Sequence, residues 1–350
     1  MAVPLVYSSK YGDYDLGEGH PFNGARFRAF IELLEASDAA SSFELVEPEP
    51  ASREVLERVH APSYLDRIAA LERVGGMLTL DTPVLPGMVD AARLIVGGAL
   101  TATRSVMDGA PVACAFGGFH HAARDDGGGF CLFNDVAVAA RTLLDGPDVE
   151  RVMIIDTDAH HGNGTQDIFY DDRKVLFVSL HQDPRTLYPG RGFLSELGAG
   201  TGLGYTVNIP LPPYSGLPRF RRAFDEVVTP LTRSFSPDVI IRNGGSDPYV
   251  GDELTELALD MAGLEAVGAM VRELSDTSCG RLVDLTISGY GDHVPQSWAA
   301  LIRGVTGVDI PVDYPEERVE LPGDQEGEDP MFARVLDRLR GHLAEHWDCF

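Results

Sequence analysis

The sequence predicts an α/β fold, a three-layer α/β/α arrangement with a mostly parallel central sheet. Short apolar runs alternate along the chain with segments of helical periodicity, which is the pattern of consecutive strand–helix–strand units. Several apolar runs are followed by polar or glycine-rich loops, namely residues 117–121, 156–164, 243–247 and 289–291. Ligands bind at the carboxyl ends of strands in open α/β sheets, so these loops mark one functional edge.

The expected strands are runs rich in valine, isoleucine and leucine, at residues 3–7, 112–116, 152–156, 175–180, 205–209, 238–242 and 282–288. Apolar residues at helical spacing predict helices at residues 25–35, 63–74, 86–107, 135–144, 218–233 and 255–274. Residues 311–330 are acidic and rich in proline and glycine, which predicts a surface excursion before a last helix at 332–346. The composition of the interior does not change, so we expect a single domain over residues 1–350.

Composition narrows the class of protein. The net charge of −26 argues against nucleic acid as a partner, because phosphate binding needs a basic surface. Solubility explains the acidity, and attraction of a cationic substrate is the alternative. We recognise neither a secretory signal nor a membrane-spanning run, and four scattered cysteines favour free thiols in a reducing cytoplasm (Cys114, Cys131, Cys279 and Cys349). The sequence leaves homo-oligomer formation open.

A candidate metal site follows the predicted strand 152–156. Asp158 and His160 are two residues apart on an extended chain, so their side chains point to the same side. Asp247 comes after another strand and a glycine pair, and it is the best third ligand, although a helix cap or a turn would also suit it. Such a set suits Zn²⁺, and also Fe²⁺ or another divalent ion, with one position open for water.

Two further loops carry residues for acid–base chemistry. His120 and His121 follow a glycine pair, where one imidazole can act as a general base and the other as an acid, unless both are structural. Asp156 and Asn163 are candidate partners for their second ring nitrogens. Tyr290 lies between two glycines and could stabilise an oxyanion, although a lone tyrosine more often packs.

These motifs resemble the zinc-dependent histone deacetylase family, which also includes acetylpolyamine amidohydrolases and acetoin-utilisation proteins. The main matches are at residues 117–122, 128–131 and 156–165. Shorter matches occur in the expected order at residues 19–21 with Arg26, at His60 and Tyr64, and at 178–181, 188–190, 244–247 and 289–290. The resemblance covers roughly residues 5–300 and implies the arginase/deacetylase-like fold.

The resemblance also implies a role for each matching residue. Asp158, His160 and Asp247 correspond to the zinc ligands. His121 corresponds to the general base and His120 to its electrostatic or acid partner, and Tyr290 polarises the substrate carbonyl. The matching residues of the acyl tunnel are Gly129, Phe130 and Tyr188. A structural K⁺ beside the zinc would be held by Asp156, Asp158, His160, Ser179 and Leu180.

Three positions depart from the family pattern. Asn163 replaces an aspartate that part of the family carries, which affects the tuning of a histidine. The run before Tyr290 is less glycine-rich than usual. Polyamine-specific members can carry a glutamate seven residues after the last zinc ligand, where this chain has Leu254 at the substrate-binding rim, with Glu253 beside it. Leu254 weakens a polyamine hypothesis, whereas Glu253 and the acidic surface support it.

The implied function is zinc-dependent hydrolysis of a linear amide by an activated water, which removes an acetyl or other acyl group from an acyl-lysine or a small acylated amine such as an acetylpolyamine. An arginase-like ureohydrolase is one alternative, but a second metal would need an aspartate where Gly162 stands. A non-catalytic binding module on the same scaffold is another, but all the ligands, both histidines and the tyrosine are present.

Overall fold

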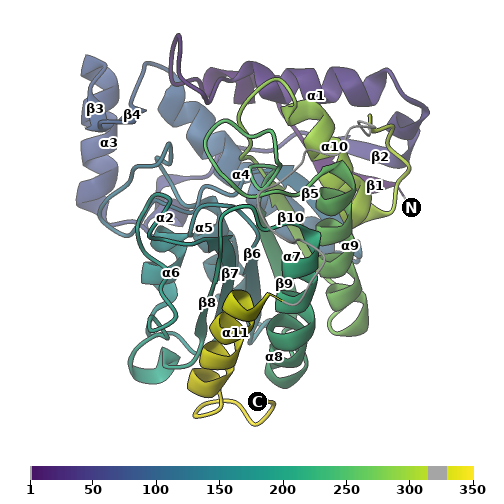
Figure 1. Cartoon of the computed structure of the whole chain (residues 1–350). Coiled ribbons are helices and arrows are strands. Elements are labelled where there is room, and N and C mark those ends of the chain that lie inside the picture. The colour runs from purple at the N-terminus through teal and green to yellow at the C-terminus, as the bar shows by residue number, and fades with distance from the viewer. Residues whose placement is uncertain (1, 314–328) are drawn as a thin grey trace.

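An eight-stranded sheet forms the centre of the computed structural model, which describes residues 2–313 and 329–350 (Figure 1). Its strands are Val3–Val6 (β1), Phe43–Val46 (β2), Val112–Phe116 (β5), Val152–Asp156 (β6), Val175–Gln182 (β7), Thr206–Leu211 (β8), Val239–Gly244 (β9) and Leu282–Thr286 (β10). Their order is β2-β1-β5-β10-β9-β6-β7-β8, and neighbouring strands pair in parallel. The α/β fold class with a mostly parallel sheet is confirmed. A separate antiparallel hairpin joins Met77–Thr79 (β3) to Thr82–Pro83 (β4).

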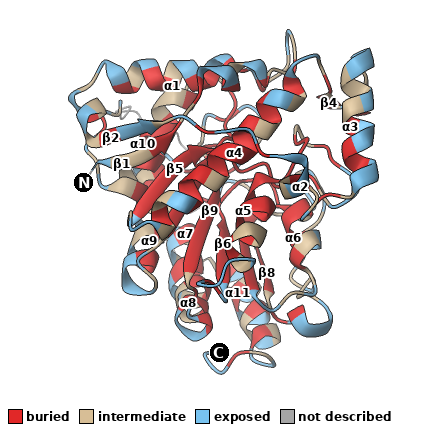
Figure 2. Ribbon diagram, turned by 180° about the vertical axis from the view of Figure 1, so that it is seen from behind, coloured by how far each residue is buried: buried red, intermediate tan, exposed pale blue. Residues whose placement is uncertain are grey.

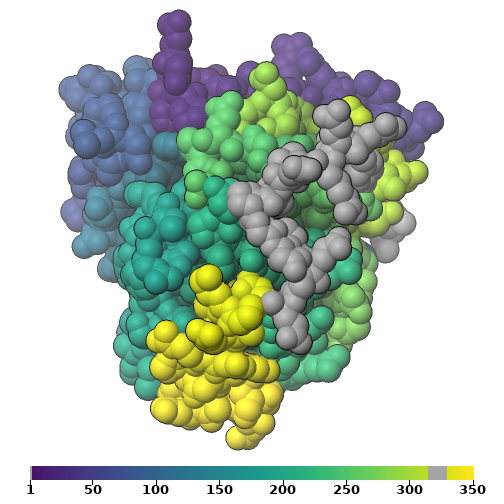
Figure 3. Space-filling model, viewed as in Figure 1, coloured from purple at the N-terminus to yellow at the C-terminus, as the bar shows by residue number. Residues whose placement is uncertain are grey.

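Helices cover both faces of the sheet (Figures 1 and 2). One face carries Met88–Met107 (α4), Asp135–Leu144 (α5) and the shorter Arg53–Leu56 (α2) and Asn163–Phe169 (α6). The other carries Met261–Thr277 (α9) and Val294–Thr306 (α10), with Leu217–Ala223 (α7) and Thr229–Phe235 (α8) beside them. Ala25–Glu35 (α1) packs on α10, and Pro62–Val74 (α3) lies beside the β3–β4 hairpin. Pro330–Leu343 (α11) packs against β8, with its yellow surface exposed in Figure 3.

The central strands are buried along their whole length, which explains their continuous apolar sequences. Every residue of β5, β6, β7, β9 and β10 is buried (Figure 2). A parallel sheet covered on both faces has no solvent side, so its strands do not alternate between apolar and polar residues. Among the helices described, none is long and apolar enough to cross a lipid bilayer.

Several predicted boundaries were wrong, for identifiable reasons. The predicted helix 255–274 begins only at Met261, where the Asp260 carboxylate accepts the N–H of Gly263 as an N-cap. The predicted helix 218–233 is interrupted by a π-helical turn, Phe224–Val228 (η4), between α7 and α8. The predicted strand 282–288 ends at Thr286, and the last helix spans Pro330–Leu343. Of the acidic excursion predicted at 311–330, residues 314–328 lie outside the described residues.

The topology gathers four functional loops that are far apart in sequence. Strands β5, β10, β9 and β6 are consecutive neighbours in the sheet. The loops after them carry the histidine pair, Tyr290, Asp247 and Asp158, respectively. Because all four strands run in parallel, their carboxyl ends meet at one edge.

A buried histidine links the helical layer to the loop after β5. His60 is fully buried, its Nδ1 lies 2.8 Å from the carbonyl oxygen of Ala123, and its Nε2 accepts the N–H of Asn134 at 3.0 Å. This arrangement requires the neutral ring with the proton on Nδ1. Burial lowers the pKa of His60 to about 4, although the Ala123 carbonyl favours the charged form.

We predict that His60 contributes to acid sensitivity of the fold. A histidine pKa below its unfolded value near 6.5 gives stability that is present at neutral pH and is lost as the pH falls from about 6.5 to about 4. The free energy of unfolding should therefore decline across this window, by at most about 1.4 kcal/mol per pH unit for one proton. His60→Gln should lower stability at pH 7 and flatten this slope in urea unfolding.

Tyr64→Phe is the matched control, because it removes the neighbouring hydrogen bond from the Tyr64 hydroxyl to the Leu132 carbonyl and no titrating group in this pH range. This variant should keep the wild-type pH slope. An unchanged slope in His60→Gln would show that His60 does not carry the effect.

Candidate active site

Three buried side chains converge at the carboxyl edge of the sheet. His160 Nδ1 lies 2.9 Å from Asp247 Oδ2 and 3.2 Å from Asp158 Oδ1. One ligand atom from each residue lies within 4.8 Å of the others, which is the geometry of a three-ligand metal site. Burial opposes a charge on His160, but hydrogen bonds to the two carboxylates raise its pKa to about 10. The same negative field would favour a divalent cation, so the residues fit a metal ion.

The strands and their loops fix these ligands. Asp158 and His160 lie in the bend after β6, while Asp247 follows β9, which pairs with β6. Asp247 Oδ1 accepts hydrogen bonds from the Ala159 N–H at 3.1 Å and from the Ser288 hydroxyl at 3.0 Å. These two donors leave Oδ2 directed toward His160.

The two adjacent histidines have different partners. His120 Nδ1 lies 3.1 Å from Asp156 Oδ2, and His121 Nδ1 lies 2.7 Å from Asn163 Oδ1. Their Nε2 atoms are 3.2 Å apart, so both rings face one point. Burial opposes a charge on His120, but Asp156 and Asp158 raise its pKa to about 9. Burial, with the positive charge of His120 and His160, holds the pKa of His121 well below its usual value.

Tyr290 lies on the opposite side of a narrow pocket. The ring centroids of Tyr290 and His160 are 6.4 Å apart, and the phenol is buried. Burial, followed by the charges of Asp158 and Asp247, raises its pKa well above the usual value, so the hydroxyl keeps its proton. The pocket has a volume of about 20 Å³, and its lining includes both histidines, Asp158, His160, Gly129, Phe130 and Tyr290.

The wall of this pocket depends on an unusual backbone. Phe130 has a positive φ of 69°, and its N–H donates to the Thr82 hydroxyl while its carbonyl accepts from the Tyr14 hydroxyl. Gly129 has a φ of 52°, and a Cβ there would lie 2.5 Å from the His121 ring and 2.9 Å from Tyr188. Tyr188, which is 47% exposed, packs edge-on against His121 with ring centroids 5.1 Å apart. Gly129 therefore lets the mouth residue Tyr188 approach the histidine pair.

The residues predicted to hold K⁺ also lie together. Asp156 and Ser179 are paired across β6 and β7, and their side-chain oxygens are 3.5 Å apart. Leu180 follows on β7, and all three are buried. At Gly162, a Cβ would lie 2.4 Å from Asp156 Oδ2, so this position has no room for a second-metal carboxylate.

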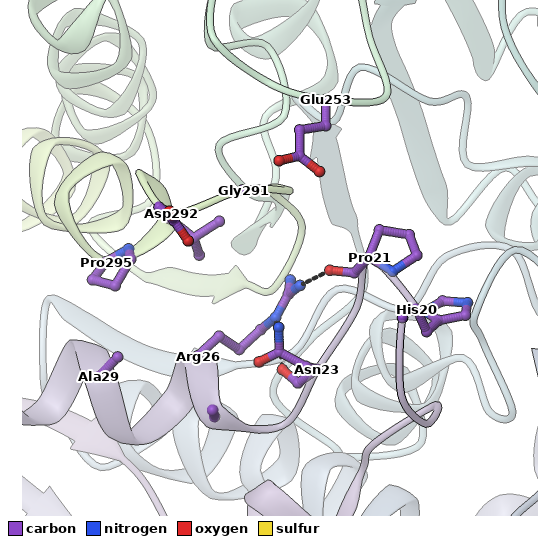
Figure 4. Close-up of a pocket in the computed structure, with 12 residues that line it drawn as sticks. His20, Pro21, Asn23, Arg26, Ala29, Glu253, Gly291, Asp292 and Pro295 are labelled. Atoms are coloured by element: carbon purple, nitrogen blue, oxygen red, sulfur yellow. Dashed lines mark hydrogen bonds between the residues drawn. The ribbon is translucent and has the colours of Figure 1, made fainter.

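Leu254 lies apart from the predicted tunnel residues. It packs partly buried against the core, and it is absent from the pocket lining. Its neighbour Glu253 instead faces an outer cavity of about 390 Å³ together with Arg26, Gly291 and Asp292 (Figure 4). Arg26 separates this cavity from the narrow pocket, since its guanidinium donates to the carbonyls of residues 287 and 289.

Sequence reasoning missed residues that support the site from other elements. The Asn243 amide lies 3.0 Å from Asp156 Oδ1 and 3.2 Å from His120 Nδ1. Asp135 accepts the N–H groups of Gly118 and Phe119, directly before the histidine pair. Asn134-Asp135 is recognisable as a helix start, but the long-range partners are not visible in the sequence.

Comparison with known proteins gives consistent matches. The histone deacetylase domain matches residues 20–305. The acetoin utilization protein AcuC of Bacillus subtilis is 36% identical over 327 residues, which cover 89% of this chain and 84% of that protein. A probable deacetylase of Archaeoglobus fulgidus is 33% identical over 364 residues, covering 100% of both chains. The crystal structure of the HDA15 HD domain aligns with a TM-score of 0.85 at 25% identity and covers 100% of this chain and 97% of that chain.

We predict that Gly129→Ala closes the pocket. The added methyl group would overlap the His121 ring and Tyr188, and a positive φ disfavours alanine. Catalytic efficiency on an acetylated amine should fall by about 100-fold, since small displacements of reacting groups cost that much. Gly200→Ala is the matched control, because Gly200 has a φ of 53° and no atom within 4 Å of its Cβ position. Equal losses in the two variants would attribute the effect to backbone strain alone.

Proposed function

The chain belongs to the histone deacetylase family, and we propose that it is a Zn²⁺-dependent deacylase that hydrolyses the linear amide of an acylated amine. The family and the relatives indicate deacetylation of an acylated amine. One observation supports Zn²⁺-dependent hydrolysis of a linear amide. The Asp158–His160–Asp247 cluster, the histidine pair and Tyr290 surround one narrow pocket. This arrangement supplies a metal site, a base, an acid and an oxyanion donor together.

The ion would be held by Asp158, His160 and Asp247, where it supplies Lewis-acid chemistry, polarising a carbonyl and making water more acidic. His121 is suited to accept a proton, because Asn163 Oδ1 takes the Nδ1 proton and leaves Nε2, which faces His120 Nε2 at 3.2 Å, as the acceptor. His120, held by Asp156, is suited to carry a proton to the departing amine.

Tyr290 supplies the remaining donor. Its high pKa keeps the phenol protonated, and its side chain lines the narrow pocket. It can therefore donate to the oxygen that becomes negative when water attacks the carbonyl. K⁺ bound at Asp156, Asp158, His160, Ser179 and Leu180 would offset negative charge beneath the site.

The proposed substrate is an amide that joins a small acyl group to a primary amine. The pocket has a volume of only about 20 Å³, and this small size favours acetyl over longer acyl chains. Acyl-lysine side chains and acetylpolyamines present the same acyl–NH–CH₂ unit to this pocket. Glu253 and Asp292 outside it favour an amine that carries a further positive charge.

We predict that metal removal abolishes activity. Chelated protein should lose turnover of acetyl-lysine peptide, acetylated polyamine and longer acyl-lysine alike, and Zn²⁺ should restore it. Zn²⁺ at 100 times its Kd should also stabilise the fold by about 2.7 kcal/mol, seen as a higher Tm. Asp158→Asn should lose both effects. Undiminished turnover in fully metal-free protein would contradict the zinc dependence.

We also predict that Tyr290→Phe lowers kcat by about 10²–10³-fold, as expected for loss of one oxyanion donor. KM and metal content should change little, because the phenol contacts the ground-state substrate weakly and is not a ligand. Tyr249→Phe serves as the control, since that ring stacks on His293 outside the pocket. Wild-type kcat in Tyr290→Phe would remove Tyr290 from the mechanism.

A further inference from the structure

Two loops are joined beside the pocket through the backbone of Tyr290. The Tyr290 N–H donates to Asp252 Oδ2 at 2.8 Å. The carbonyl of Tyr290 accepts the N–H of Glu253 at 3.3 Å. Both backbone groups of the tyrosine are therefore held by the loop that follows the metal-site residue Asp247.

Asp252 is itself fixed in place. Its carboxylate is buried, and its other oxygen, Oδ1, accepts the N–H of Leu254 at 2.9 Å. The His293 ring lies beside it, with Nε2 3.9 Å from Oδ2, and Tyr249 stacks on that ring with centroids 4.6 Å apart. A carboxylate with two backbone donors and a packed flank offers a rigid anchor.

Tyr290 needs such an anchor because the glycines on either side of it allow many backbone conformations. Gly289 and Gly291 have φ values of 123° and 120°, which glycine alone adopts without strain. The carbonyl of Gly289 accepts a hydrogen bond from Arg26 Nη1 at 2.9 Å. Among the described residues, Asp252 is the side chain that receives the N–H of Tyr290 itself.

We propose that Asp252 is a positioning residue for Tyr290, setting the direction of the phenol by fixing the backbone of its loop. This rests on the proposed function, in which Tyr290 donates to the oxyanion. Asp252 is not among the residues that line the pocket, so it affects the reaction only through Tyr290.

Asp252→Asn tests this with little change of shape. The amide can accept one of the two N–H groups but must turn its own NH₂ toward the other, so the clamp is broken. The kcat for an acetylated substrate should fall by about 10-fold, with KM and Zn²⁺ content unchanged. In the Tyr290→Phe background the same substitution should cost less than about 2-fold, because both changes remove one interaction.

Activity on a trifluoroacetyl substrate distinguishes a misplaced Tyr290 from a general structural defect. Its carbonyl is more electrophilic and depends less on an oxyanion donor, so the loss in Asp252→Asn should shrink as it does in Tyr290→Phe. Asp252→Glu, which keeps the charge but displaces it, should show the same pattern if Asp252→Asn folds poorly.

Asp238→Asn is the matched control. Asp238 also accepts two backbone N–H groups, from Glu150 at 2.8 Å and Arg151 at 2.9 Å, directly before β9. Both bind Oδ2, so this variant controls for the loss of charge at a carboxylate that anchors backbone away from the pocket. That variant should keep kcat within about 2-fold even if its Tm falls.

The outcomes distinguish the positioning role of Asp252 from the deacylase mechanism. Wild-type kcat in Asp252→Asn, or a full additional loss in the Tyr290→Phe background, overturns the positioning role while the deacylase stands. An equal loss on acetyl and trifluoroacetyl substrates overturns it also. Full activity of Tyr290→Phe overturns the proposed mechanism and this inference together.

Discussion

Buried negative charge at the carboxyl edge of the sheet is the constraint on which the site depends. Asp156, Asp158 and Asp247 are all but inaccessible to solvent. An uncompensated carboxylate in the interior costs several kcal/mol, so each must be paired or hydrogen-bonded. Asp156 receives His120 and the Asn243 amide, and Asp247 receives a hydroxyl and a backbone N–H on one oxygen. Asp158 Oδ1 and Asp247 Oδ2 face His160 Nδ1, and a divalent cation there would complete the compensation.

The parallel sheet makes this concentration of charge stable. The four strands before the functional loops are neighbours. A buried ion pair, Arg242 with Asp284, lies below the site. Arg242 on β9 bonds Asp284 on β10, and it also donates to the Thr157 hydroxyl at 3.1 Å, between the two aspartates of the β6 loop. Arg242 thus joins three strands under the metal cluster. Loss of either Arg242 or Asp284 would leave an unpaired buried charge, so the two residues must be kept together across β9 and β10.

The sequence predicted the parts of this structure that depend on local pattern. Buried strands are continuous apolar runs, and their carboxyl ends hold Asp158, His160 and Asp247, so both the fold class and the ligand cluster were within reach. Helix α10 was missed, although the less buried Gln296 and Arg303 lie seven residues apart on one side of it and Trp298 and Ile302 are buried. The contacts of Asn243 and Asp252 were also missed, since they join residues 38 or more positions apart.

The division between interior and rim explains why the reaction is better defined than the amine. Residues inside the pocket are fixed by the sheet and by hydrogen bonds, and under the proposed function they would meet only the acyl group and its amide. The rest of the amine would meet loop residues such as Tyr188 and Glu253, which are exposed. Substrates with the same acyl–NH–CH₂ unit differ only in the rest of the amine. The enzyme must therefore discriminate between them through the outer contacts, because the inner contacts are common to all of them. A chain that keeps the inner residues can therefore change its amine by altering loops alone.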